Sequence, residues 1–560
     1  MKKNFLVLTA LLALTSCGSQ AASLIPQSED SAIPSVAPSI EPSITPSVAP
    51  SVASSAVPSI EPSVEPSVEP SIEPSVTPSV APSVEPSVEP SIEPSVTPSI
   101  FPSEDPSLAP SVTSELPPEE DPFYYEDFYD HSSEVKITIK LTNEHASRLC
   151  DFGNPDNVAT QDIYHPCDVL VTVNGETREF KEAGIRIKGN MSRGDSADFF
   201  TSDGHINGGG HFKISFNENF SDNDFYTPTE DESVLKARRF GNAKKFDIKW
   251  NRNFDEKFTR EAYASSILED SGLMAQKINL AKVKFITDTE EREFTYQVLE
   301  TIDEEFLKRR LPKAEAKGDL YKTGWVNSDN NNLTSSSDYL MGVEDKATNK
   351  FFVYDLNTNK KKSTHESLKN LISALNSDDR SLSTEELKAK LESIIDIDYW
   401  LKFAAMEYLI GNPDSWRYHY NNTYLYFNSG NGKLYPIMFD NDRCFGITQD
   451  WYVNTWSRWP TTSKTSIWVE GGDMRSTQEN PLYIRTIVSS DNERWPLVQE
   501  YQERYVQYVS EFANRYMNAS TYDAFVSDFY MTDDVLGDNV SINDYFSGIL
   551  GQINDYLNRG

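Results

Sequence analysis

The chain has 560 residues and a formal net charge of −35 at pH 7, from 86 acidic and 51 basic side chains. This balance argues against a nucleic-acid-binding protein, because binding to a phosphate backbone depends on clustered Lys and Arg. The acidity favours solubility and partners that are basic or are bridged by metal ions.

The first 16 residues are typical of a bacterial lipoprotein signal peptide. Lys2 and Lys3 precede an apolar run from Phe5 to Leu14, which is too short to span a membrane. The run ends in Leu-Thr-Ser-Cys, which resembles a lipobox, so we expect cleavage before Cys17 and lipidation of its sulfur. An ordinary signal peptide with an incidental cysteine is the alternative. The expected location is extracytoplasmic, with the lipid anchoring the chain to the cell membrane or outer surface.

A four-residue repeat rich in Pro and Ser runs from Pro34 to Pro110. Proline fixes φ and removes a backbone donor, so the repeat is incompatible with a helix or a central strand. It predicts a disordered, extended stalk over residues 17–120, followed by a globular body.

The body is expected to be α+β with two lobes, because strands dominate its first half and helices its second. The first lobe is assigned to residues 121–310 and the second to 311–560. Apolar alternation predicts strands at 135–141, 168–173, 183–188, 212–216, 282–286 and 294–299, and helical spacing predicts a helix at 258–268.

Helix signals become frequent in the second half of the body. Ser383 to Glu386 form a capping box, and Asp398 is expected to cap an apolar helix over 399–410 that ends at Gly411. Further helices are expected over 481–512 and in the last forty residues.

Three cysteines lie in the body, and they form no zinc-binding pattern with each other or with His. Cys150 and Cys167 are candidates for a disulfide in an oxidising compartment, which would leave Cys444 alone.

The segment from Gly411 to Gly446 carries the strongest signal for chemistry. A loop with Asp414 follows the apolar helix, then come Asn421 and Asn422. A hairpin centred on Asn431-Gly432 follows, formed by strands at 424–427 and 433–439.

Asp440 and Asp442 stand directly after this hairpin. Phosphoryl transfer needs one carboxylate to orient the acceptor hydroxyl, and a carboxylate and an amide to hold the metal ions. Oxygen ligands of this kind suit Mg²⁺ or Mn²⁺. The same residue types also occur in ordinary turns and helix caps, and the residues alone leave both interpretations open.

Several segments, in this order, resemble the spore coat protein H (CotH) kinase family over roughly residues 135–520. They are Ile185–Arg193, Phe212–Phe216, Tyr296–Asp303 with Phe306-Leu307, Gly318–Lys322, the 411–446 segment and Asn480–Leu482. Two departures lie in the first segment: Lys188 replaces the Arg of the family's Arg-Gly, and Met191 replaces a usual Ser.

The resemblance implies a protein-kinase-like fold that uses ATP and a divalent metal. It implies that Asp414 is the catalytic base and that the metal ligands are Asp440, Asp442 and Asn421 or Asn422.

For the nucleotide, the resemblance implies that Lys213 contacts the phosphates and pairs with Glu261. It also implies that Gly189 to Arg193 cover the phosphates, and that Glu300 and Asp303 line the hinge. An exposed strand lysine, an ordinary turn and a helix cap are the respective structural alternatives.

The expected function is an extracytoplasmic protein kinase acting on Ser or Thr of surface or secreted proteins. The main alternative is a non-catalytic surface adhesin or assembly scaffold of the same fold. A metal-dependent hydrolase is less favoured, because His419 is the one histidine near these carboxylates and is expected in a surface loop. A serine hydrolase is disfavoured by the lack of a Gly-x-Ser-x-Gly elbow.

Overall fold

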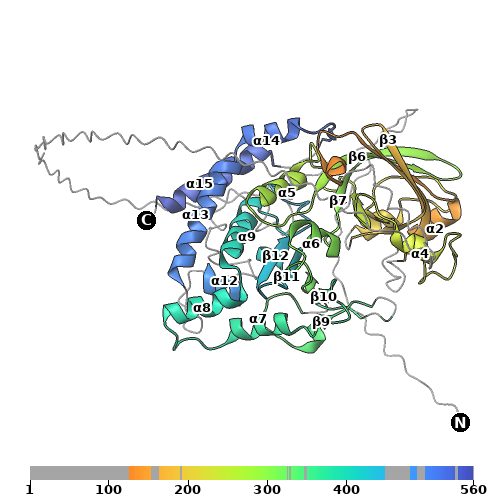
Figure 1. Cartoon of the computed structure of the whole chain (residues 1–560). Coiled ribbons are helices and arrows are strands. Elements are labelled where there is room, and N and C mark those ends of the chain that lie inside the picture. Colours follow the sequence, from red (N-terminus) through yellow and green to blue (C-terminus); the bar gives the residue numbers. More distant parts are fainter. Residues whose placement is uncertain are drawn as a thin grey trace, which may run out of the picture. The chain divides into compact units, whose positions relative to one another are not determined.

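The computed structural model describes residues 125–558 except 153–162, 190–191, 325, 327–328, 346–347, 349, 448–479, 488–497 and 537–539. The expected signal peptide, Cys17 and the Pro/Ser stalk lie outside the described residues. The described part combines helices and sheets, which confirms the predicted α+β class (Figure 1).

Seven strands of the described chain close into a barrel, in the order β1-β2-β3-β4-β5-β7-β6. They are β1 (Val135–Lys140), β2 (His165–Val173), β3 (Glu176–Ile187), β4 (Phe212–Ser215), β5 (Lys245–Lys249), β6 (Ile278–Ile286) and β7 (Glu291–Glu300). Neighbouring strands are antiparallel, except for the parallel pair β1 and β6.

Strand alternation explains why the barrel forms. Successive side chains of a strand point to opposite faces, and the inward ones, such as Ile137, Val171 and Ile248, are almost fully buried. The structure has a strand at each of the six predicted positions, and it adds β5, which the sequence reading missed.

Short helices accompany the barrel, and one longer helix lies between it and the rest of the chain. The short ones are α1 (Tyr125–Tyr129), α2 (Asn143–Phe152), α3 (Arg193–Ala197) and α4 (Glu232–Ala237). The longer helix, α5 (Arg260–Asp270), follows β5 and packs against β6 on one side and α9 (Ile397–Ile410) on the other.

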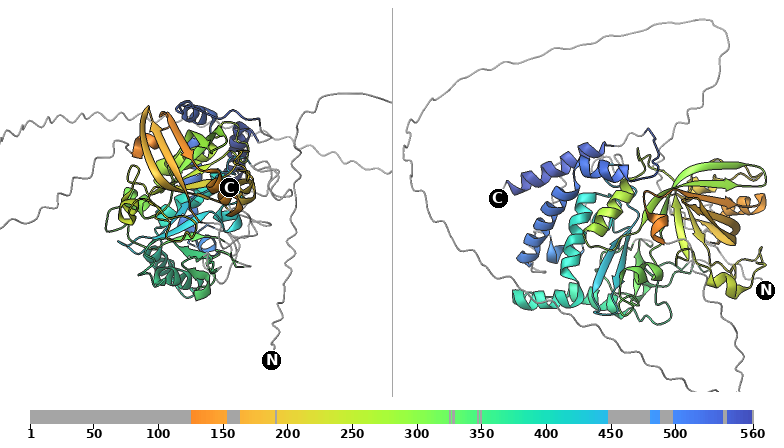
Figure 2. Two further views of the ribbon diagram at one scale, coloured as in Figure 1. Left: turned by 90° about the vertical axis from the view of Figure 1, so that its right-hand side faces the viewer. Right: turned by 45° about the horizontal axis from the view of Figure 1, so that its top comes forward.

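The described residues from Glu304 onward form a region dominated by helices, which we call the helical region (Figure 2). Its helices are α6 (Glu304–Arg310), α7 (Glu366–Asn376), α8 (Thr384–Ile394), α9, α10 (Trp416–His419), α12 (Pro481–Thr486), α13 (Gln499–Tyr516), α14 (Ala519–Ser527) and α15 (Ile542–Leu557). A short 3₁₀ helix, η2 (Asp338–Leu340), precedes β9.

A second sheet lies within the helical region. Its strand order is β12-β11-β8-β10-β9. The strands are β8 (Leu320–Thr323), β9 (Met341–Gly342), β10 (Tyr354–Leu356), β11 (Thr423–Phe427) and β12 (Leu434–Met438). β11 and β12 form the predicted hairpin, with Gly432 at a φ of 74° in its turn.

The helix caps follow the sequence signals with one exception. The capping box of Ser383 and Glu386 is present at the start of α8, and Gly411 ends α9 in a left-handed conformation. The predicted cap of α9 is wrong, because Asp396, and not Asp398, accepts the hydrogen bond from the Tyr399 amide. Asp398 lies inside the helix and forms ion pairs with Lys402 and Arg504.

The three cysteines of the body are buried free thiols. Cys167 donates a hydrogen bond to the Ala183 carbonyl, while Cys150 accepts one from the Phe200 amide. The disulfide considered between Cys150 and Cys167 is therefore not formed. Among the described helices, we find none with the length and apolarity needed to cross a bilayer.

Candidate active site

The loop after α9 and the loop after β12 are tied together by the side chain of Asn412. Its Nδ2 donates to the Asp440 carbonyl at 3.1 Å and to Oδ1 of Asn441 at 3.2 Å. The amide of Phe445 also donates to the carbonyl of Ile410 at 2.9 Å. The β11–β12 hairpin runs out and back, so the loop before it, which carries Asp414, lies next to the loop after it, which carries Asp440.

Asp414 is held by the two asparagines that follow it. Oδ1 of Asp414 accepts a hydrogen bond from Asn421 at 3.1 Å, and Oδ2 accepts one from Asn422 at 3.0 Å. Burial raises the pKa of Asp414 to about 7, and the carboxylates of Asp440 and Asp442 act in the same direction. The Asp414 side chain is thus fixed in orientation and titrates near neutrality.

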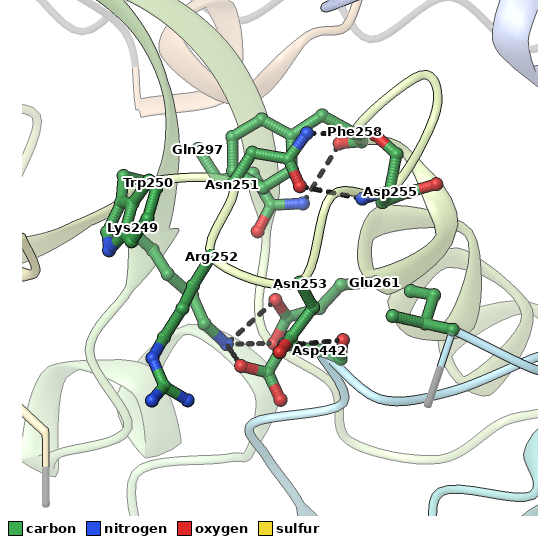
Figure 3. A pocket seen from close by; sticks show the side chains of 11 residues that line it. Lys249, Trp250, Asn251, Arg252, Asn253, Asp255, Phe258, Glu261, Gln297 and Asp442 are labelled. Carbon is green, nitrogen blue, oxygen red and sulfur yellow. Dashed lines mark hydrogen bonds and ion pairs between the residues drawn. The ribbon is translucent and has the colours of Figure 1, made fainter. Parts of the chain in front are cut away.

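Lys249, at the end of β5, links the barrel to these carboxylates. Its Nζ lies 2.9 Å from Oε2 of Glu261, 2.6 Å from Oδ1 of Asp440 and 3.4 Å from Oδ2 of Asp442. Figure 3 shows the ammonium group of Lys249 next to the carboxylate oxygens of Glu261 and Asp442. Both Lys249 and Glu261 are nearly fully buried, so α5 contributes a carboxylate to the site from inside the protein.

Charge and burial set the pKa values of this group. Burial by itself lowers the pKa of Lys249, but the carboxylates of Asp440, Asp442 and Glu261 outweigh it and hold the pKa well above the usual value. Burial raises the pKa of Glu261 to about 7, despite the opposing effect of Lys249. Burial also acts to raise the pKa of Asp440, but Lys249 and Lys188 reverse the effect and hold it well below its ordinary value.

Comparison with known protein families matches residues 213–556 to the family described as CotH kinase protein. This match covers more than half of the 560 residues. The chain belongs to the CotH kinase protein family. A search of the curated proteins finds no match.

The CotH match starts at Lys213, within β4. The segment Ile185–Arg193, which the sequence analysis compared with the same family, lies outside the matched residues. The matched region contains Asp414, Asp440 and Lys249.

The expected pair of Lys213 and Glu261 is not present. Nζ of Lys213 lies 2.8 Å from Oδ1 of Asp247 and donates to Oγ1 of Thr301 at 3.3 Å. Lys249 takes the place next to Glu261, because β5, and not β4, leads directly into α5. The alternation of Phe246 and Ile248 with polar residues was the signal that identifies β5 as a strand.

Glu300 lies at the end of β7 and is 1% exposed. Its carboxylate forms ion pairs with Arg309 and Arg310 of α6 and accepts a hydrogen bond from the Lys277 amide. Asp303 caps α6 by accepting hydrogen bonds from the amides of Glu305 and Phe306. Asp303 thus forms the helix cap that was the structural alternative, whereas Glu300 forms ion pairs and no cap.

Gly189 follows β3 with a φ of +101°, a region that disfavours other residues. A Cβ atom at this position would lie 2.0 Å from Oγ of Ser192 and 3.8 Å from Nδ1 of His211. Gly189 is therefore required by the turn. Asn190 and Met191, part of the expected phosphate-covering segment, lie outside the described residues.

The expected metal ligands are oxygen donors of the kind that Mg²⁺ and Mn²⁺ prefer. Asp440 and Asp442 both form ion pairs with Lys249. The amide nitrogens of Asn421 and Asn422 instead donate hydrogen bonds to Asp414. In the part of the chain that the structure describes, no three Asp, Glu, His or Cys side chains are grouped closely enough to hold a metal by themselves.

A small pocket lies beside Lys249 (Figure 3). Its lining includes Trp250, Asn251, Phe258 and Gln297 as well as Glu261. Its volume is about 10 Å³, which is room for about one water molecule. It is too small for a nucleotide.

Proposed function

We propose that this CotH-family chain is an atypical protein kinase with a two-lobed fold, in which the barrel is one lobe and the helical region the other. It would transfer the γ-phosphate of ATP to Ser or Thr of surface or secreted proteins. The observation that carries the proposal is the meeting of Asp414 with Asp440 in one site, next to a buried Lys249–Glu261 pair. Phosphoryl transfer is catalysed by positioning and by charge, and these are the parts it requires.

Asp414 is the residue placed to receive a proton. Its pKa of about 7 lies near the expected working pH, where a general base is most effective. In the proposed step the acceptor hydroxyl oxygen bonds to the γ-phosphorus, and its proton passes to Asp414. The bond from the γ-phosphorus to the β–γ bridging oxygen breaks, and ADP leaves with that oxygen.

Asn421 and Asn422 hold both oxygens of Asp414 and so fix the direction in which the carboxylate accepts the proton. Lys249, which Glu261 orients from α5, supplies positive charge for the phosphates. Because Lys249 also contacts Asp440, its ammonium group lies at the junction between the barrel and the loop after β12.

Asp440 and Asp442, with an amide oxygen from Asn421 or Asn422, are the residues that would hold a divalent cation. A Mg²⁺ or Mn²⁺ ion bound there would neutralise charge on the β- and γ-phosphates. Asp440 and Asp442 already pair with one cation, the ammonium group of Lys249. This pairing supports the proposal that the site accepts positive charge.

We further propose that the kinase acts outside the cytoplasm, anchored to the bacterial membrane by lipid on Cys17 and extended from it by the Pro/Ser stalk. The lipobox-like sequence and the repeat support this location. Metabolic labelling with a fatty-acid analogue tests it: the label is expected on the native chain and not on a Cys17→Ser variant. Equal labelling of both chains would disprove the anchor.

The test of the activity is transfer of labelled γ-phosphate from ATP by the purified full-length chain, with Mn²⁺ or Mg²⁺, to itself and to a generic basic protein. Asp414→Ala and Asp440→Ala are each expected to abolish the transfer. Asp378→Ala is the matched control, because this exposed aspartate pairs with Arg380 away from the site, and it is expected to retain activity.

Absence of transfer, together with absence of metal-dependent ATP binding, would overturn the kinase. The remaining interpretation would then be a non-catalytic surface adhesin or assembly scaffold of the CotH fold.

A further inference from the structure

The face of β3, β4 and β5 that points away from the barrel core carries two rows of polar side chains, which we call the basic face. Alternation creates it, because the intervening residues, such as Ile187, Phe212 and Ile248, point into the barrel core. The strand register places Arg186, Lys213 and Asp247 side by side in one row. The next row along the strands contains Lys188, His211 and Lys249.

The basic face keeps a positive charge in a chain that is otherwise acidic. Asp247 is its one acidic member, and its two oxygens lie 2.9 Å from Nζ of Lys188 and 2.8 Å from Nζ of Lys213. One carboxylate therefore serves two lysines. Lys188 has a side-chain exposure of 24%, so this end of the row is accessible to a ligand.

His211 occupies the centre of its row. The amide of Lys188 donates to the His211 carbonyl at 2.8 Å, and the pairing of Phe212 with Ile248 places Lys249 on its other side. Adjacent strands lie about 4.8 Å apart, so the three side chains stand next to one another.

The imidazole of His211 has an unusual environment. The residue is 6% exposed, and its buried Nε2 has no hydrogen-bond partner among the residues that the structure describes. A buried polar atom without a partner is destabilising, so it calls for an explanation. A ligand that supplies the missing partner is such an explanation.

The interactions of Asp440 indicate where the imidazole of His211 lies in the site. Asp440 interacts electrostatically with both Lys188 and His211, in addition to its contact with Lys249. The row thus faces the carboxylate that the proposed function assigns to the metal, which is where a phosphate chain would lie.

We propose that Lys188, His211 and Lys249 form one row of nitrogen donors for a condensed phosphate chain, with Nε2 of His211 bonded to a phosphate oxygen. The ligand class is a nucleoside di- or triphosphate or free tripolyphosphate. The inference rests on the proposed function, because ATP is the condensed phosphate that the reaction uses.

The chemistry of His211 agrees with this role. Burial, together with Lys249 and Lys188, lowers its pKa well below the usual value, so it is a neutral imidazole. A neutral imidazole carries one N–H donor, and the proposed hydrogen bond requires the tautomer with that proton on Nε2. The N–H of His211 then adds a directional hydrogen bond to the phosphate chain, at a position between the ammonium groups of Lys188 and Lys249.

The test is calorimetric binding of ATP, ADP, adenosine and tripolyphosphate to the full-length chain, without an acceptor protein. His211→Ala is expected to weaken ATP and ADP binding about tenfold, the effect of about 1.4 kcal/mol, and to leave adenosine binding unchanged. His211→Gln, which retains an N–H donor, is expected to recover part of the loss.

His205→Ala is the matched control, because His205 lies in the same β3–β4 connection but is exposed and contacts Glu290. It is expected to bind every ligand as the native chain does. Thermal unfolding of each variant checks that it is folded. If His211→Ala fails this check, the comparison of His211→Gln with the native chain decides.

The outcomes separate the two proposals. Native ATP affinity in a folded His211→Ala variant, or an equal loss for adenosine and ATP, would overturn the role of His211 and leave the kinase standing. Binding of tripolyphosphate but not of ATP would support the row and refute ATP as the donor. Failure of the native chain to bind any of the phosphate ligands would overturn both.

Discussion

Nζ of Lys249 lies 2.6 Å from Oδ1 of Asp440, across 191 residues of sequence. The contact joins the end of β5 to the loop after β12. Glu261 completes it from α5. The ammonium group thereby holds together the three parts of the chain that the candidate active site needs.

The first prediction separates the two strand lysines. Lys249→Ala is expected to abolish phosphate transfer, whereas Lys213→Ala is expected to reduce it by less than tenfold, because Lys213 pairs with Asp247 and not with Glu261. Rates of transfer measured for both variants check this. A larger loss with Lys213→Ala would restore the assignment that the sequence alone suggested.

The Lys249 substitution is also expected to affect stability. Lys249→Ala is expected to lower the free energy of unfolding by about 2–3 kcal/mol, less than the roughly 3–5 kcal/mol for breaking a fully buried pair. The reason is that the Asp440 side chain is 37% exposed. Adding Glu261→Gln should recover part of the loss in denaturant unfolding. Strictly additive losses would show that the two side chains do not interact.

The second prediction concerns Asp414. Asp414→Asn is expected to lower kcat by about 10²–10⁴-fold, the usual contribution of a general base, with little change in KM for ATP. In the native chain kcat should rise with pH through a pKa near 7. A flat profile over this range would exclude Asp414 as the group that accepts the proton.

The third prediction is the pH dependence of stability in the absence of metal. The Asp414 carboxyl loses its proton near pH 3.8 in the unfolded chain and near pH 7 in the folded one. Between these values the folded state binds more protons, so the Asp414 contribution makes the free energy of unfolding fall as the pH rises. Asp440 has the opposite sign, because its lowered pKa gives stability that is lost as the pH falls.

Denaturant unfolding at several pH values, with a chelator present, measures this slope. Asp414→Asn should remove one contribution and make the decline up to about pH 7 shallower. A slope identical to that of the native chain would mean that the pKa of Asp414 is not raised.

The fourth prediction concerns Asn412, which ties the two acidic loops together. Asn412→Ala is expected to lower kcat about 10-fold or more, because small misplacement of catalytic groups is costly. Asn431→Ala, in the exposed turn of the β11–β12 hairpin, is the matched control and should leave kcat within about twofold. Equal effects of the two substitutions would assign Asn412 a general structural role.

The fifth prediction is that the body contains no disulfide. In a Cys17→Ser variant, the three remaining cysteines should resist thiol reagents in native buffer and all react in denaturant, since each is buried. Burial raises the pKa of Cys150 to about 12, which further suppresses its thiolate. A reductant should leave Tm unchanged, whereas a structural disulfide would cost several kcal/mol on reduction.

Local patterns in the sequence were sufficient for much of the fold. Period-two alternation located strands such as β1 and β6, because one face of each is buried in the barrel. Asn431-Gly432 located the hairpin, because glycine readily adopts the positive φ that the turn has at position 432. The sequence also indicated that Asp414, the two asparagines and Asp440 lie near one another, since only a short hairpin separates them.

What only the tertiary structure decided is the partner of each charged side chain. Lys213 and Lys249 both alternate with apolar residues on neighbouring strands, and the sequence does not show which strand lies beside α5. The choice depends on the path of the chain around the barrel, which brings β5 next to β7 and directly into α5. A buried ion pair forms where the fold places opposite charges together, and that placement is set by contacts distant in sequence.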